Sequence, residues 1–279
     1  MRRSVKAILL VAAMGATALV ATRVQAQTSS PRVVPAQAPQ PRDTGAGLTE
    51  TEFVPISPCR LYDTRQGQGG SRIGAGNFRI LKVKGPENIP GQYSGQGGKA
   101  GGCGVPVAAT AIEATVTAVT PAGTGFLRLW PSGQPETTST FLNYIAGFNP
   151  TNTGATAICN VSCGAASDLR VKAFGAATHV VIDVQGYYVK PLAAIVGPTG
   201  SLVTGSRVVT TSRPFTGQYL VQFDRTVDQC VATVSADGLT GNSYAMVGAD
   251  SADNTRVYVF TSDANGALQN RGFHLTLTC

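Results

Sequence analysis

The sequence predicts an all-β protein, and three features support this. Gly (33 residues) and Pro (16 residues) interrupt the 279-residue chain too often for long helices. Short stretches in which apolar and polar residues alternate recur along the chain, as they do in short strands joined by turns. Charged residues make up only 13% of the chain, and Thr, Ser, Gly, Ala and Val take their place, which suits exposed β-structure. We therefore expect two disulfide-braced β-sandwich domains, jelly-roll or immunoglobulin-like, after a signal peptide and a flexible tether.

The first 26 residues have the order of a secretory signal peptide. Arg2, Arg3 and Lys6 precede an apolar run over residues 7–21, and small residues follow at the cleavage-determining positions Val24 and Ala26. This predicts a secreted protein, located outside the cell, on its surface or in the periplasm, where cysteines form disulfides. Residues 27–52 are rich in Pro, Gln, Ser and Thr and are expected to be a disordered tether.

The net charge of +7 overstates the basic character of the exported protein. Four of the 22 basic residues lie in the leader, which leaves 18 basic against 15 acidic residues, a net charge of +3. No run of Lys or Arg is interleaved with aromatic residues, so we expect no nucleic-acid partner. No second long apolar segment follows the leader, so we expect no membrane span.

The first domain is predicted over residues 53–190. A stretch from Phe53 leads to Cys59, and the Gly-rich segment 91–104 is expected to be a surface loop. Between Ile112 and Ala118 apolar and polar residues alternate, which is typical of a half-buried strand. The other strands are expected at residues 78–83, 126–130, 140–145, 169–174 and 179–188.

The second domain is predicted over residues 200–279, after a boundary at residues 190–205. Lys190-Pro191 and the sequence GPTG at 197–200 are expected to end the first domain. Strands are expected at residues 208–210, 219–223, 230–234, 244–247, 257–261 and 273–279. In the last of these, alternation places Phe273, Leu275 and Leu277 on one face together with Cys279.

Six cysteines are expected to form structural disulfides; they are Cys59, Cys103, Cys159, Cys163, Cys230 and Cys279. Six cysteines allow fifteen pairings, and spacing alone does not choose between them. Cys230 and Cys279 are the two cysteines of the second domain and are expected to pair, both from core-facing positions. Pairing of Cys59 with Cys103 would tie the first strand to the Gly-rich loop, and Cys159 would then pair with Cys163.

The sequence contains no recognisable catalytic constellation, and we expect no enzyme activity, cofactor or metal. His179 and Asp183 share a strand face, but four strand residues separate them by roughly 13 Å, too far for a hydrogen bond. His274 is expected to be an outward residue of the last strand. Asp250, Asp253 and Asn254 are clustered oxygen donors without the spacing of a strong calcium site, and a polar loop is favoured.

Two further groups of residues leave alternatives open. Trp130, Tyr144 and Tyr187 could form an aromatic platform for a sugar, because aromatic rings stack on flat apolar faces; core packing explains them equally well. Asp63 and Arg65 could form a buried ion pair that braces the start of the first domain, or a surface turn.

The chain also shows two resemblances to secreted bacterial proteins. The sequences SPCRLYDTR at residues 57–65, CGVP at 103–106 and THVVIDVQGYY at 178–188 resemble a module that recurs in secreted bacterial proteins and has no established activity. Residues 200–279, with GQY at 217–219, FDR at 223–225, VYV at 257–259 and FHL at 273–275 before Cys279, resemble a C-terminal domain of secreted bacterial proteins, some of them collagen-like. That second resemblance implies a role in assembly or display, with a homo-oligomer, including a trimer, left open. Neither resemblance supplies a catalytic residue.

These observations predict a non-catalytic secreted protein that acts in cell-surface adhesion, envelope structure or extracellular assembly. Its expected partner is an extracellular protein or a glycan surface. The alternative is a carbohydrate-binding module that uses the aromatic platform around Trp130.

Overall fold

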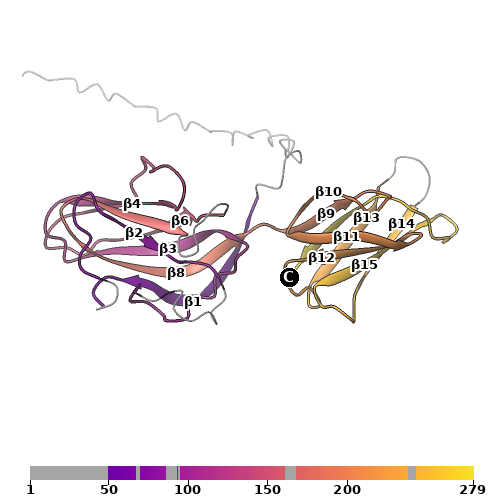
Figure 1. Cartoon of the computed structure of the whole chain (residues 1–279), viewed down its shortest axis with the longest axis horizontal. Helices are drawn as coiled ribbons and strands as arrows, with labels where there is room; N and C mark the ends of the chain where they lie inside the picture. Colours follow the sequence, from indigo (N-terminus) through magenta and orange to yellow (C-terminus); the bar gives the residue numbers. More distant parts are fainter. Residues whose placement is uncertain (1–49, 67–69, 86–92, 94, 161–167, 238–242) are drawn as a thin grey trace, which may run out of the picture. The chain divides into compact units, whose positions relative to one another are not determined.

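The computed structural model describes residues 50–66, 70–85, 93, 95–160, 168–237 and 243–279. Within these residues the chain forms β-strands and no helix (Figure 1). The strands make four antiparallel sheets of four strands each, so the predicted all-β class is confirmed. The predicted signal peptide (1–26) and nearly all of the predicted tether (27–52) lie outside the described residues.

The first two sheets are built from residues 52–189, and we call them the first sheet pair. One sheet has the strand order β1-β8-β3-β6 and the other β2-β7-β4-β5. The strands are β1 (Glu52–Asp63), β2 (Phe78–Leu81), β3 (Ala109–Val119), β4 (Gly125–Pro131), β5 (Leu142–Tyr144), β6 (Thr151–Ala157), β7 (Leu169–Gly175) and β8 (His179–Val189).

Alternation along the strands builds the core of the first sheet pair. Ile112, Ala114 and Val116 of β3 are buried, and the residues between them are partly exposed, as the period of a half-buried strand requires. Val180, Ile182 and Val184 of β8 are buried as well, with Asp183 partly exposed between the last two, although Val181 is also buried. Both sheets contribute to one cluster of buried apolar residues. One face of each sheet therefore packs in the core, and the other face points away from it.

The other two sheets, built from residues 192–278, form the second sheet pair. Their strand orders are β10-β9-β16-β13 and β11-β12-β15-β14. The strands are β9 (Leu192–Val196), β10 (Leu202–Ser206), β11 (Val208–Phe215), β12 (Gln218–Phe223), β13 (Val231–Ala236), β14 (Ser243–Ala249), β15 (Arg256–Asp263) and β16 (Phe273–Thr278). Tyr219, Phe223 and Phe273 are fully buried in a second, separate cluster of apolar residues.

The predicted boundary at residues 190–205 contains strands instead of a plain linker. Leu192–Val196 forms β9, which pairs with β16 of the second sheet pair. The break at Gly197-Pro198 is the turn between β9 and β10, where the Gly200 N–H donates to the Gly197 carbonyl. The second set of strands therefore begins at Leu192 and not at residue 200.

Two disulfides join the predicted partners. Cys59 of β1 is bonded to Cys103 of the Gly-rich loop, and Cys230 is bonded to Cys279. The expectation that both cysteines face the core holds for one of them: Cys230, partly buried before β13, packs against the core cluster. It is wrong for Cys279, which follows β16 at an exposed position. Cys163 lies outside the described residues, and with it the predicted Cys159–Cys163 bond.

Candidate binding face

Two of the three predicted platform residues are buried. Trp130 is 4% exposed and Tyr144 is 2% exposed. The Tyr144 hydroxyl lies 2.9 Å from the Phe174 carbonyl oxygen and 2.6 Å from that of Ala176, and a side chain at Gly125 would clash with the Tyr144 ring. A sugar-stacking ring must offer a free face, so Tyr144 and Trp130 do not form the predicted exposed platform.

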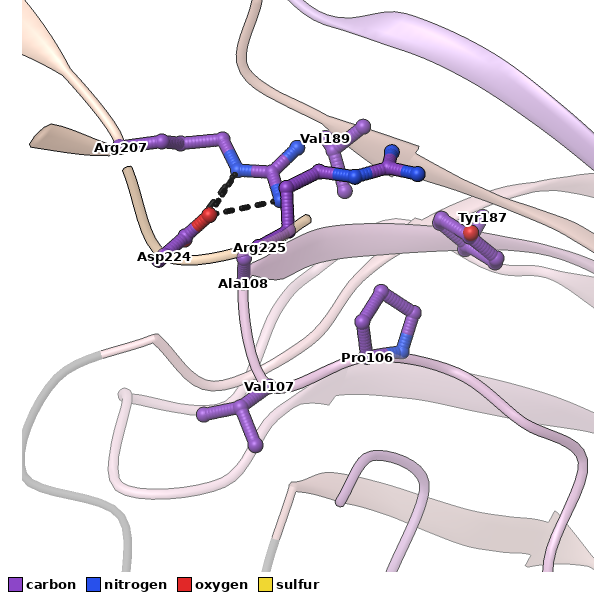
Figure 2. A pocket seen from close by; sticks show the side chains of 8 residues that line it. All are labelled: Pro106, Val107, Ala108, Tyr187, Val189, Arg207, Asp224 and Arg225. Carbon is purple, nitrogen blue, oxygen red and sulfur yellow. Dashed lines mark hydrogen bonds and ion pairs between the residues drawn. The ribbon is translucent and has the colours of Figure 1, made fainter. Parts of the chain in front are cut away.

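Tyr187, the third predicted platform residue, lies on the other sheet of the pair. It belongs to β8, packs partly against the core, and lines a hollow with Pro106 and Val189 (Figure 2). The same figure shows the ion pair of Arg207 with Asp224, in which Nε donates to Oδ1 over 3.0 Å. The structure therefore does not bring Tyr187 together with Trp130 and Tyr144.

The histidine and carboxylate singled out on β8 have separate partners. His179 Nδ1 lies 3.0 Å from the Thr64 hydroxyl oxygen, and burial lowers the pKa of His179. Asp183 accepts a hydrogen bond from Arg60, 3.2 Å between Nη2 and Oδ2. His274 is exposed on β16. The structure therefore keeps the imidazole and the carboxylate of β8 apart.

The carboxylates considered from the sequence, Asp63 in one group and Asp250 with Asp253 in the other, form ion pairs with arginines. The buried Asp63 carboxylate pairs with Arg65, with 2.8 Å between Nη2 and Oδ2, but the Arg65 side chain is 43% exposed, so the ion pair is buried at its acid only. Asp250 and Asp253 both pair with Arg256, and their Oδ1 atoms accept backbone N–H bonds from the same turn. These carboxylates close a polar turn.

The outer face of the β2-β7-β4-β5 sheet is a feature that the sequence patterns do not reveal. Leu127 and Leu129 of β4 point into the core, so alternation turns Phe126, Arg128 and Trp130 to the opposite face. The same alternation acts on β7 and β2. The resulting cationic aromatic face has three cross-strand rows: Asn143, Phe126 and Phe174; Arg128, Lys172 and Phe78; and Trp130, Arg170 and Ile80.

Each cation of this face lies over an aromatic ring. The Arg128 guanidinium lies 4.7 Å from the centroid of Phe174, which is itself stacked on Phe126 at 4.6 Å. Lys172 Nζ lies 4.7 Å from the Phe174 centroid, and the Arg170 guanidinium lies 5.2 Å from that of Phe78. Such contacts hold the charged groups in fixed positions over the rings.

A carboxylate of the chain itself is bound on this face. Glu136, in the loop between β4 and β5, pairs with Lys172 over 2.6 Å and with Arg128 over 3.0 Å. The hydrogen bond from Lys172, with help from Arg128, lowers the pKa of Glu136. Arg128 and Lys172 therefore already form a two-cation site that holds one carboxylate.

Arg170 has no such partner. Among the described residues no carboxylate pairs with it, and its Nε is buried without a hydrogen-bond acceptor. Next to it, Trp130 lines a hollow of about 260 Å³ with Thr137 and Ser139, and its indole N–H has no acceptor among the described residues. The face thus carries one guanidinium with no carboxylate partner among the described residues, in the same cross-strand row as the buried Trp130.

A search along the sequence could not find this face, because its members come from separate strands. The signal is present in two segments: FLRLW at residues 126–130 and LRVKAF at 169–174 both alternate inward apolar residues with cations or aromatic rings. The register that places Arg128 opposite Lys172, and Trp130 opposite Arg170, is set by the pairing of β4 with β7. That pairing joins strands that are not neighbours in the sequence.

Comparisons with protein-family models, curated proteins and solved structures found no match to this chain. Across the described part of the chain, no helix has the length and apolar character needed to cross a membrane.

Proposed function

We propose that this chain is a non-catalytic secreted protein that binds an acidic polysaccharide through the cationic aromatic face. Its role would be adhesion, envelope structure or extracellular assembly. The observation that carries the proposal is Arg170, a guanidinium stacked on Phe78 with no carboxylate partner among the described residues. It lies beside Lys172, which already holds a carboxylate.

The chemistry of the neighbouring groups favours a uronic acid polymer over a simple anion. A guanidinium can hold a carboxylate by two parallel hydrogen bonds, and aromatic rings pack against the apolar face of a sugar. The hydroxyl groups of Thr137 and Ser139, which lie 3.0 Å apart in the loop that also carries Glu136, can bond sugar hydroxyls. This keeps the predicted carbohydrate ligand and moves it from a stacked platform to a charged sheet face.

An extracellular setting is supported by the Cys59–Cys103 and Cys230–Cys279 disulfides, since such bonds persist in oxidising compartments. The absence of catalysis is part of the proposal. His179 and Asp183, the pair considered in the sequence, are each engaged by a different residue instead of by one another.

The test measures binding of the purified protein to immobilised polygalacturonate, with neutral dextran as the reference polymer. We expect binding to polygalacturonate alone, weakened by added salt because the contacts are ionic. Arg170→Gln should weaken binding about tenfold, the effect of losing one well-placed charged contact. The matched control is Arg225→Gln, which removes the same charge from an exposed residue of the second sheet pair and should leave affinity unchanged.

The Glu136→Gln variant should change the affinity for polygalacturonate in the opposite direction. Glu136 occupies Arg128 and Lys172, so removing its charge frees both cations and should strengthen binding to polygalacturonate. Equal binding to dextran, tighter binding to nucleic acid, or no effect of Arg170→Gln would each contradict the proposal.

A further inference from the structure

A second unpartnered face lies on the β11-β12-β15-β14 sheet of the second sheet pair. Tyr219 and Val221 of β12 and Val257 and Val259 of β15 point into the core, so their neighbours along each strand point away from it. Hydrogen bonds join the four strands in the order β11, β12, β15 and β14. Their register aligns two rows on the outer face: Phe215, Gln218, Phe260 and Met246; and Ser212, Leu220, Tyr258 and Gly248.

Large apolar side chains of this outer face are exposed to an unusual degree. Phe215 is 69% exposed, Met246 is 63% exposed, and Tyr244, two residues before Met246 on β14, is 56% exposed. Tyr258 and Phe260 add a stacked aromatic pair with 6.2 Å between ring centroids. We call these residues, with Leu220, the apolar face.

The apolar face carries no charged side chain in its two rows. The next cross-strand row begins the polar border, where Thr210 pairs with Gln222 and Gln222 with Arg256. Arg256 is itself neutralised by Asp250 and Asp253. A strongly charged partner would therefore find no opposite charge to pair with on this face. A second copy of the same uncharged face can pack against it without burying an unpaired charge.

The size of the apolar face agrees with what a dimer requires. Large aromatic side chains bury about 150–250 Å² each when covered, so exposed fractions above one half leave roughly 100 Å² on each of Phe215 and Tyr244. With Met246 and the less exposed residues the face reaches about 500 Å², the range in which exposed patches mark interaction sites. Two such faces together would bury about 1,000 Å², the lower bound of specific interfaces.

We propose that the apolar face packs against the same face of a second copy of this chain, which makes the protein a homodimer. A two-fold axis places each row against its own copy, so one surface serves as both halves of the interface. Sheets that pack face to face interdigitate their side chains about 10 Å apart, and the aromatic and methionine side chains here supply that layer. The biological role of this dimer rests on the proposed function, because the apolar face would be the surface through which the protein takes part in extracellular assembly.

Self-association is measured without any glycan, so its failure is distinct from failure of polygalacturonate binding. Sedimentation velocity of the purified protein at about 1 to 100 μM should show a dimer that dissociates on dilution, as expected for a micromolar interface. Met246→Glu places a charge within the contact and should leave a monomer at every concentration. The matched control is Val231→Glu, which places the same charge at a 73%-exposed strand residue of the other sheet in the pair and should leave the dimer intact.

Circular dichroism and thermal unfolding establish that each variant is folded. If Met246→Glu does not fold, Phe215→Gln serves as the second variant, since Phe215 lies at the opposite edge of the same row. A wild-type monomer at about 100 μM, at the weak end of specific association, would overturn the inference. So would a folded Met246→Glu protein that is still dimeric, or an oligomer larger than a dimer.

Discussion

Asp63 is the buried acid on which the start of the first sheet pair depends. Its carboxylate accepts hydrogen bonds from the Arg65 backbone N–H (2.9 Å), from Arg65 Nε (2.9 Å) and from Arg60 Nη1 (3.0 Å). The Arg65 hydrogen bond is the largest cause that lowers the pKa of Asp63, from 3.8 to about 2, and burial opposes it. A buried carboxylate with this many donors stabilises the fold only while it is ionised.

The Asp63 pKa predicts a specific loss of stability in acid. The folded-state value lies below the ordinary one, so the stabilisation is complete above about pH 4 and is lost as the pH falls towards 2. Its size is about 2 kcal/mol, from a shift of nearly two pKa units. Asp63→Asn should lower the free energy of unfolding by at least this amount at pH 7.

Denaturant unfolding of wild type and Asp63→Asn from pH 7 to pH 2 checks this prediction, with Asp228→Asn, at an exposed position, as control. The difference between wild type and Asp63→Asn should shrink as the pH falls. A difference that is constant over this range would mean that Asp63 contributes through packing and not through its charge.

At the scale of the strand, a strand could be predicted from the sequence where apolar and polar residues alternate. The segments that form β3 and β16 alternate apolar and polar residues, and the structure places strands there. Thr151–Ala157 is not predicted as a strand, because the sequence TNTGATA has no large apolar residue; it is held as β6 by its pairing with β3, with Thr153 and Thr151 bonded across to Thr115 and Thr117. Such a strand is defined by its neighbour, which a single sequence does not reveal.

The candidate site was harder to predict than the strands for the same reason. Trp130 stands out in the sequence as the one tryptophan, yet its exposure depends on what covers it, and only 4% of it is exposed. Arg170 and Phe78 are far apart in the sequence and meet only because β2 pairs with β7. Residue type can be read from the sequence, whereas cross-strand neighbours follow from a register that many long-range contacts decide together.

The Cys230–Cys279 disulfide fastens one end of the β13–β16 pair. The register pairs Val231 with Thr278, so the disulfide lies next to the last residue pair of these two strands. In the chain-entropy account, closing a loop of 49 residues stabilises the fold by up to about 4 kcal/mol. The double change Cys230→Ala and Cys279→Ala should lower the free energy of unfolding by a large part of this figure.

Urea unfolding of the double variant checks this prediction, with mass mapping to verify that Cys59 and Cys103 are still bonded. A decrease of less than about 1 kcal/mol would show that the β13–β16 backbone ladder already restricts the chain, so the bond adds little. Mapping that finds Cys230 or Cys279 as a free thiol in the wild type would contradict the bond itself.

At the scale of the whole molecule, the two proposed surfaces belong to different sheet pairs and have different chemistry. The cationic aromatic face carries Arg128, Arg170 and Lys172, and the apolar face carries no charge in its two rows. Dimerisation through the second would therefore leave the first free on both copies. Each dimer would present two glycan-binding faces, which matters when the ligand is a long polymer.

Bivalency predicts that dimerisation strengthens binding to a surface without changing the site. On densely immobilised polygalacturonate the second face of a dimer binds at high effective concentration, so the apparent affinity should exceed that of a monomer by about a hundredfold. Met246→Glu should therefore lower affinity for the surface and leave affinity for a soluble short oligogalacturonate unchanged, because that ligand reaches one face only. Arg170→Gln should weaken both interactions. Biosensor measurements on the polymer surface and calorimetry with the soluble oligomer distinguish these outcomes. If wild type and a monomeric Met246→Glu protein had equal affinity for the surface, the two faces would act independently.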